Sequence, residues 1–209
     1  MTGRRRRALP RAFFARDSRE VAPELLGKVL VRDDPEVGRL AIRLVEVEAY
    51  AGEGDPGSHA FRGPTARNAT MFGPAGYLYV YFTYGMHWCA NVVCGDEGWA
   101  SAVLLRGAEP LEGLDAFRQR RPAARSDRDL CSGPARLAQA LGLDRTHDGA
   151  DLVRGPIRLF DDGAAPAAAV SIRIGLSAGR GDDHPWRWYV PGDPNVTRSS
   201  AARKVASAR

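Results

Sequence analysis

Residues 40–50 read Leu-Ala-Ile-Arg-Leu-Val-Glu-Val-Glu-Ala-Tyr, and the alternation within this stretch decides the fold. Side chains on a β-strand point alternately to its two faces. One face of a strand over these residues would carry Leu40, Ile42, Leu44, Glu46, Glu48 and Tyr50. An apolar stripe thus gives way to two carboxylates and an aromatic ring. This pattern fits a catalytic carboxylate, but it also fits a strand that simply ends at the surface.

Two further strands are predicted at 77–83 and 87–94, around a tight connection at 84–86. One face of the first strand carries Tyr77, Tyr79 and Tyr81. The other face carries Leu78, Val80 and Phe82, and we expect this face to point toward the core. A row of tyrosines is often only a sheet surface, because aromatic residues favour strands. A tyrosine at the hairpin tip of a basic protein is less ordinary, since it could serve as a wedge between stacked bases.

The other segments complete a mixed pattern without a repeating βαβ unit. Residues 20–31 predict a helix that runs into a strand after Gly27, and a second helix is predicted from the candidate cap Ser132 to a stop at Gly142. The remaining expected elements are strands at 100–106, 171–176 and 186–190, a helix at 110–120, and loops at 120–128 and 161–169. We therefore expect an α+β fold, a single mixed domain with a curved, mostly antiparallel β-sheet flanked by helices and a protruding β-hairpin. The domain is expected over 11–197, with flexible tails at 1–10 and 198–209.

The composition favours a globular protein with an anionic partner. The chain has 209 residues, 44% of them hydrophobic, which is enough for one sizeable core. The net charge is +5, and lysine occurs only at Lys28 and Lys204, so arginine carries nearly all the positive charge. A GC-rich genome would also explain that bias. No apolar run approaches the roughly 20 residues of a membrane span, and no hydrophobic region typical of a secretory signal follows the first arginines. We expect a cytoplasmic protein without a membrane contact.

Neither a disulfide framework nor a metal site is expected. The three cysteines, Cys89, Cys94 and Cys131, are an odd number without close paired spacing. His87 lies near two of them, but the spacing fits no common zinc pattern. We therefore expect no metal and no cofactor.

Five segments in one order carry a family resemblance. They are residues 45–50 (Val-Glu-Val-Glu-Ala-Tyr), Arg67-Asn68 with Met71-Phe72, residues 79–81 with Tyr84-Gly85-Met86, residues 103–106 with Glu109-Pro110, and residues 130–134 (Leu-Cys-Ser-Gly-Pro). Together they closely resemble the 3-methyladenine (alkyladenine) DNA glycosylases over approximately residues 25–190. The resemblance implies a formyltransferase C-terminal-like barrel. It also implies base excision repair of alkylated or deaminated purines in duplex DNA, in a bacterial enzyme that works at the nucleoid as a monomer.

The resemblance also assigns roles to individual residues. By it, Glu48 is the general base that activates a water, and Arg106 helps to hold that water and keeps the carboxylate ionised. The walls around the extruded base are Tyr50, His59 and Tyr81, with Asn91 disfavouring normal guanine. Tyr84 enters the minor groove with the help of Met86. His87 departs from the tyrosine of some relatives, which affects the hairpin and not the chemistry.

Two consequences concern chemistry and register. Glycosylases that also cut the strand form a Schiff base through an amine, and neither Lys28 nor Lys204 is a natural nucleophile, so simple hydrolysis to an abasic site is expected. For Asn91 to share a face with Tyr79, the hairpin needs a three-residue loop at 84–86. A two-residue turn would put Asn91 on the other face.

Candidate phosphate contacts are weaker. Ser132 and Arg136 stand at the start of a helix whose free amides could take a phosphate, but an ordinary capped helix fits equally well. Arg62 and Arg67 lie in a polar loop near His59, where a solvated surface is the alternative. Trp186 and Trp188 are expected in the core.

Three other functions fit parts of the pattern. A non-catalytic lesion sensor would keep the pocket but would not require a carboxylate at Glu48. The folate-linked formyltransferase C-terminal domains have a similar architecture but lack the tyrosine-tipped hairpin. A glycosylase directed chiefly at deaminated purines such as hypoxanthine would use the same pocket.

Overall fold

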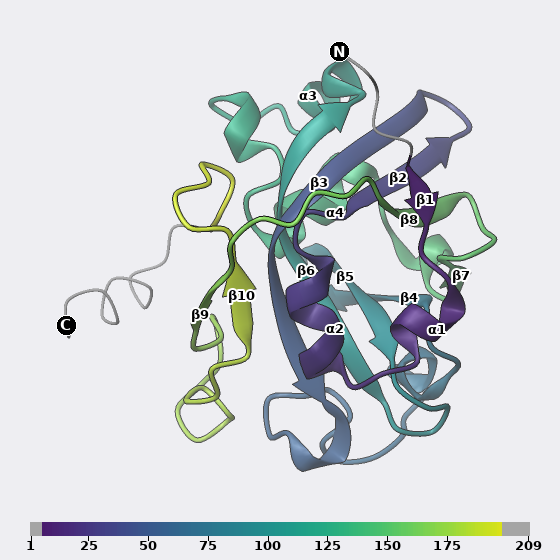
Figure 1. Cartoon of the computed structure of the whole chain (residues 1–209), viewed down its shortest axis with the longest axis vertical. Helices are drawn as coiled ribbons and strands as arrows, with labels where there is room; N and C mark the ends of the chain where they lie inside the picture. Colours follow the sequence, from purple (N-terminus) through teal and green to yellow (C-terminus); the bar gives the residue numbers. More distant parts are fainter. Residues whose placement is uncertain (1–5, 198–209) are drawn as a thin grey trace.

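The computed structural model describes residues 6–197, and a curled antiparallel β-sheet forms its centre (Figure 1). Its strands are β1 (Arg7–Ala8), β2 (Val29–Asp34), β3 (Gly38–Ala51), β4 (Tyr77–Thr83), β5 (His87–Cys94), β6 (Ser101–Glu112), β7 (Ala150–Asp151), β8 (Ile157–Asp161), β9 (Ala169–Ser171) and β10 (Arg187–Tyr189). Their order is β1-β8-β2-β3-β6-β5-β4-β7, and β10 pairs with both β3 and β9. All of these pairings are antiparallel, which confirms the expected α+β class with an antiparallel sheet.

Strand β3, with 14 residues, organises the sheet. Strand β6 pairs along one edge of β3. The other edge is shared, since β2 pairs with residues 38–43 and β10 pairs with residues 46–48. The two halves of β3 therefore have different neighbours, and the second half is covered by the C-terminal part of the chain.

A bulge separates these two halves of β3. The register shifts between Leu44 and Glu46, and shifts again between Glu46 and Val47. Before the bulge Leu44 belongs to the main apolar core, and after it Val47 and Ala49 do. The bulge has thus exchanged the two faces of the strand. The predicted single face from Leu40 to Tyr50 is wrong, because Glu46 and the residues that alternate with it point away from the core that holds Leu44.

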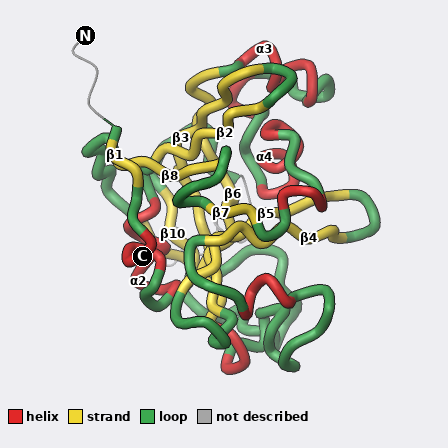
Figure 2. The backbone as a smooth tube through the Cα atoms, turned by 90° about the vertical axis from the view of Figure 1, so that its right-hand side faces the viewer, coloured by secondary structure: helices red, strands yellow, loops and turns green. Residues whose placement is uncertain are grey.

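Helices flank the sheet. They are α1 (Arg11–Phe14), α2 (Ser18–Leu25), α3 (Leu114–Arg120) and α4 (Pro134–Leu141), with short 3₁₀ turns η1 (Gly52–Gly54), η2 (Ala69–Phe72), η3 (Asp127–Asp129) and η4 (Arg145–His147). Helix α2 packs against β3 and α4 against β5, and apolar side chains of both join the main core. A second, smaller apolar cluster around Tyr79 and Met71 lies apart from that core. Figure 2 shows the β4–β5 hairpin projecting from the body.

Several predicted elements need correction. Residues 110–112 continue β6 instead of starting a helix, and α3 begins only after Gly113, whose φ is 87°. Only Ser171 of the strand expected at 171–176 is in a strand. The cap of α4 is Gly133 and not Ser132, whereas the stop at Gly142 is confirmed by its left-handed φ of 64°. Strands β1, β7 and β8 were not predicted.

The ends of the chain also differ from expectation. Arg7 and Ala8, expected in a flexible tail, pair with β8, and Leu9 is buried. Of the tails expected at 1–10 and 198–209, residues 1–5 and 198–209 lie outside the described residues. Between residues 6 and 197, no helix is long and apolar enough to cross a membrane.

Candidate active site

The Glu48 carboxylate lies in the second half of β3 with no exposed surface. Its Oε2 accepts a hydrogen bond from the Tyr50 hydroxyl at 3.0 Å and one from Nη1 of Arg106 at 3.2 Å. Its Oε1 accepts the backbone N–H of Ile174 at 2.7 Å. Tyr50 is brought there by the strand period, Arg106 by the neighbouring strand and Ile174 by the segment after β9.

Burial and charge oppose each other at this carboxylate. Burial raises the pKa of Glu48 above its ordinary value, against the charge of Arg106 and the Ile174 N–H. Burial also raises the pKa of Tyr50 well above 10, and the charge of Glu48 adds to that effect, so the phenol stays a hydrogen-bond donor. A glutamate with a raised pKa is a stronger proton acceptor than one in water once it is ionised.

A second buried carboxylate, Glu46, was not singled out for a role by the sequence. It accepts from Nε of Arg106 at 3.1 Å, from Nε of Arg187 at 2.7 Å and from the Thr197 N–H at 2.6 Å. Burial acts to raise the pKa of Glu46, but the two arginines outweigh it and hold that pKa below its ordinary value. The sequence signal that could have drawn attention to Glu46 is its position two residues before Glu48 on the same strand.

A cavity of about 280 Å³ opens beside this cluster. Its lining includes residues named from the sequence and others that were not: Tyr50, Gly57, His59, Met71, Tyr79, Tyr81, Thr83, Tyr84, Cys89, Asn91, Leu104, Arg106, Pro134, Ile174, Gly175 and Leu176. Glu48 itself lies behind the wall formed by Tyr50, Arg106 and Ile174. A volume of this size fits one small heterocycle.

Aromatic rings make one wall of the cavity. Tyr79 and Tyr81 stack with their centroids 5.4 Å apart, and His59 meets Tyr81 edge-on at 4.4 Å. His59 Nδ1 also lies 3.2 Å from the Tyr79 hydroxyl. Partial burial of the ring lowers the pKa of His59, and the charge of Arg67 adds to this effect, so the imidazole is neutral at physiological pH. The wall therefore presents π-faces without a competing cation.

The hairpin register confirms the three-residue loop. Tyr79 pairs with Asn91 and Thr83 with His87, which leaves residues 84–86 as the connection. Asn91 is 4% exposed and lines the cavity on the same side as Tyr79 and Tyr81. The structure thus brings together Glu48, Arg106 and the four predicted pocket residues, Tyr50, His59, Tyr81 and Asn91.

Comparison with known families agrees with this geometry. The family model described as Methylpurine-DNA glycosylase (MPG) matches residues 12–194. The chain belongs to the methylpurine-DNA glycosylase family. It is therefore a DNA glycosylase, a hydrolase of the N-glycosidic bond that acts in the repair of alkylated DNA.

Relatives of this glycosylase occur in bacteria and archaea. The chain is 55% identical over 193 residues to a protein of Burkholderia cenocepacia, with 90% of each chain covered. It is 53% identical over 197 residues to one of Streptomyces avermitilis, with 92% of each covered. It is 44% identical over 192 residues to one of Methanocella arvoryzae, covering 91% of this chain and 96% of that one. The names of all three include the words 3-methyladenine DNA glycosylase.

The hairpin tip of the glycosylase is apolar and exposed. Tyr84 is 80% exposed and has a left-handed φ of 52°, which is unusual for a residue other than glycine. Met86 is 67% exposed beside it. Phe82 is 43% exposed and packs on Trp88, so its predicted place in the core is wrong.

None of the four candidate phosphate contacts lines the cavity. Arg62 is exposed on the loop that carries His59. Arg67 donates from Nη2 to the Phe82 carbonyl at 2.8 Å and so braces the hairpin. Arg136 Nη1 lies 3.3 Å from the Ser132 hydroxyl, next to the first turn of α4.

The remaining expectations concern cysteines, metals and tryptophans. All three cysteines are buried and free, and Cys89 lines the cavity. Over residues 6–197, no group of three His, Cys, Asp or Glu side chains could hold a metal ion. Trp186 and Trp188 are partly buried against the main core.

Proposed function

We propose that this glycosylase removes alkylated or deaminated purines from duplex DNA by flipping the nucleotide into the aromatic cavity, and that Glu48 activates the hydrolytic water. The observation that carries the proposal is the buried Glu48 carboxylate, held by Tyr50, Arg106 and Ile174 directly behind the cavity wall. A purely structural role for Glu48 would not explain why a cavity large enough for one heterocycle lies beside this carboxylate.

Glu48 has room for one more partner. An ionised carboxylate offers about four acceptor sites, and within residues 6–197 three donors occupy them. Because Arg106 both lines the cavity and donates to Glu48, a water beside its guanidinium lies within reach of the carboxylate. The water oxygen forms a bond to the sugar C1′, its proton passes to Glu48, and the purine leaves with the electrons of the N-glycosidic bond. The product is an abasic site.

The cavity favours damaged bases through its walls. Alkylation at N3 or N7 makes a purine cationic and a good leaving group. The π-faces of Tyr81 and Tyr50 attract such a cation by roughly 0.5–2 kcal/mol each, and neutral His59 does not repel it. Asn91 lines the same cavity, where it acts against the exocyclic amino group of normal guanine.

The hairpin supplies the means of extrusion. Flipping a nucleotide costs a few kcal/mol of stacking and pairing. Tyr84 and Met86, exposed at the tip beside the cavity mouth, enter the minor groove and fill the gap. Arg62, Arg67, Ser132 and Arg136 contact the flanking phosphates. The unit that does this is a single domain that comprises 11–197 together with the β1 residues that pair with β8. It acts as a cytoplasmic monomer on the nucleoid, without a lysine Schiff base.

A base-release assay tests the proposal. Duplexes with a single 3-methyladenine, 7-methylguanine, hypoxanthine or etheno-adenine are incubated with wild type and with Glu48→Gln. Wild type is expected to release base and leave an abasic site, whereas Glu48→Gln is expected to bind the lesion duplex without releasing base. Equal release by both would reject the role of Glu48, binding without release by wild type would favour a lesion sensor, and a borohydride-trapped adduct would contradict simple hydrolysis.

A further inference from the structure

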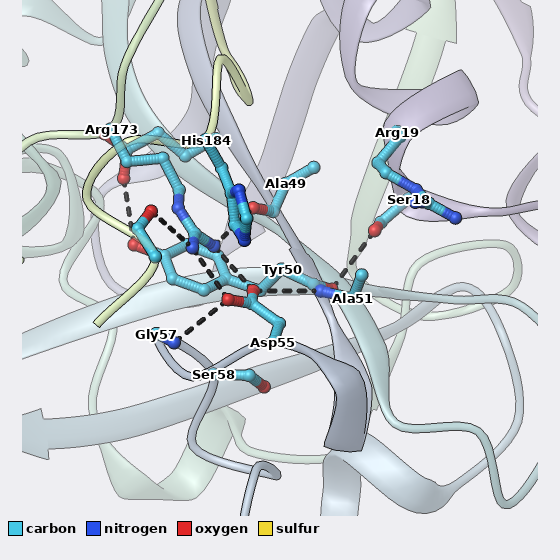
Figure 3. A network of polar contacts seen from close by, with 12 residues as sticks. Ser18, Arg19, Ala49, Tyr50, Ala51, Asp55, Gly57, Ser58, Arg173 and His184 are labelled. Atoms are coloured by element: carbon cyan, nitrogen blue, oxygen red, sulfur yellow. Dashed lines mark hydrogen bonds and ion pairs between the residues drawn. The ribbon is translucent and has the colours of Figure 1, made fainter. Parts of the chain in front are cut away.

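Arg173 is a fully buried arginine that no sequence motif drew attention to. It lies between β9 and β10, in the segment that also carries Ile174. Its guanidinium forms a two-point ion pair with Asp55, Nη1 to Oδ2 at 2.6 Å and Nη2 to Oδ1 at 2.7 Å. Figure 3 shows this ion pair. Neither of its side chains has any exposed surface. Burying two charges in this way is costly, so such a pair calls for an explanation other than stability alone.

The pair joins the two loops that frame the cavity. Arg173 also donates to the backbone oxygens of Ala49, on β3, and Gly181, at the far end of its own loop, at 3.1 and 2.9 Å. Asp55 accepts the backbone N–H groups of Ala51 and Gly57 at 3.2 and 2.9 Å. One loop therefore brings Gly57 and His59 to the cavity, and the other brings Ile174, Gly175 and Leu176.

Two glycines make this close approach possible. A Cβ atom at Gly57 would lie 2.8 Å from Nη2 of Arg173, and one at Gly181 would lie even closer to the same atom. Both distances are too short for a real carbon atom, so the backbones can close around the guanidinium only without side chains at these positions.

The pair also places a charge behind Tyr50. The guanidinium carbon of Arg173 lies 4.6 Å from the centroid of the Tyr50 ring (Figure 3). Arg173 is buried and does not line the cavity, so it covers the side of the ring turned away from a bound base. An uncompensated cation there would repel a cationic purine on the other side, and Asp55 supplies the compensating charge.

We infer that Asp55 and Arg173 are positioning residues for base excision. Arg173 holds Tyr50 and the Ile174 N–H against Glu48, and Asp55 neutralises the guanidinium so that the cavity accepts cationic bases. This inference rests on the proposed function. It makes the neutralised pair a determinant of the selection between cationic and neutral lesions.

The experiment compares single-turnover release of cationic 7-methylguanine and neutral hypoxanthine from otherwise identical duplexes. Asp55→Asn keeps the shape of the side chain but leaves the arginine charge uncompensated. It is expected to lower the 7-methylguanine rate roughly tenfold more than the hypoxanthine rate, as a unit charge at this range would. Arg173→Gln is expected to shift the ratio in the opposite direction, and the double variant is expected to restore the wild-type ratio.

Asp34→Asn is the matched control. Asp34 is a buried aspartate that pairs with Arg32 at 3.0 Å and Arg120 at 2.7 Å, and it does not line the cavity. Thermal unfolding of all variants is measured alongside, and Asp34→Asn is expected to lose stability without changing the ratio of the two rates.

The outcomes separate the inference from the function on which it rests. Equal loss on both lesions, or a ratio that the double variant does not restore, would overturn the inference while leaving the proposed function intact. If Asp55→Asn does not fold, the opposite shift expected for Arg173→Gln still decides. The proposed function would instead be overturned if wild type released neither 7-methylguanine nor hypoxanthine, or if Glu48→Gln released base.

Discussion

The Arg106 guanidinium is held by its Nε atom on the carboxylate of Glu46, at 3.1 Å. Because a guanidinium is planar and rigid, this contact fixes the direction in which Nη1 reaches Glu48. The two carboxylates together raise the pKa of Arg106, so the guanidinium remains charged at every relevant pH. Glu46 therefore orients the cation that faces Glu48, the carboxylate that we propose as the general base.

Replacing Glu46 with glutamine should destabilise the protein and slow catalysis. The change removes a buried charge from between Arg106 and Arg187, which is expected to cost roughly 3 kcal/mol of unfolding free energy. The rate of base release should also fall, because Arg106 is no longer held in place by the charge of Glu46. Denaturant unfolding and single-turnover rates measure the two effects. Glu112→Gln is the control, because its half-exposed pair with Arg6 should contribute at most about 1 kcal/mol.

The rate of base release should fall as the solution is acidified. The midpoint of this fall in the pH–rate profile should lie above the ordinary pKa of glutamate. Burial raises the pKa of Glu48, and a general base works only when it is ionised. The charged and titratable groups around it are Glu46 and Tyr50 on β3, Arg106 on β6 and Tyr81 on β4. Glu46→Gln removes a neighbouring negative charge, so its limb should move to lower pH. Single-turnover rates of wild type and Glu46→Gln are measured against pH. If the acidic limb lies at the same pH in both proteins, Glu48 is not the titrating base.

The same shift has a defined sign for stability. The folded-state pKa of Glu48 lies above that of an unfolded glutamate, so the folded protein binds this proton more tightly. The contribution is fully present below the unfolded pKa and is lost as the pH rises through the folded pKa. Glu48→Gln should therefore unfold with a weaker dependence on pH across that window than wild type.

Replacing Tyr84 with glycine should separate stability from function. Glycine adopts the left-handed φ of 52° without strain, so the hairpin should gain up to about 1 kcal/mol. The wedge is lost, and base release from duplex DNA should fall by about ten- to a hundredfold. Release from a lesion opposite a gap, where no stacking must be replaced, should fall less. Trp99→Ala removes another exposed aromatic, 60% exposed in a different turn, and should leave both rates unchanged.

Periodicity predicted the central strands but not the bulge in β3 that turns Glu46 and Glu48 toward the site. The alternation at 40–50 places a strand there, and β3 confirms it. It does not reveal the bulge at Val45, because a bulge depends on the pairing with β6 and leaves no local mark in the sequence. Without the bulge, Glu46 and Glu48 would point into the apolar core.

Residues that act through distant partners were also out of reach. Arg173 lies in the segment wrongly predicted as a strand at 171–176, and its partner Asp55 is 118 residues away. The helix predicted at 110–120 starts too early, because residues 110–112 continue the pairing of β6 with β3. Short strands such as β1 and β8 depend on tertiary pairing, which no window of sequence contains.

Strand β10 and Thr197, from the far end of the chain, contact the half of β3 that carries Glu46 and Glu48. During synthesis, Glu46 is made 141 residues before Arg187 and 151 residues before Thr197, and Glu48 is made 126 residues before Ile174. A nascent chain thus carries two acidic side chains without the neighbours that make them useful. The set of contacts around these two carboxylates is therefore complete only after the C-terminal part of the chain has packed against β3.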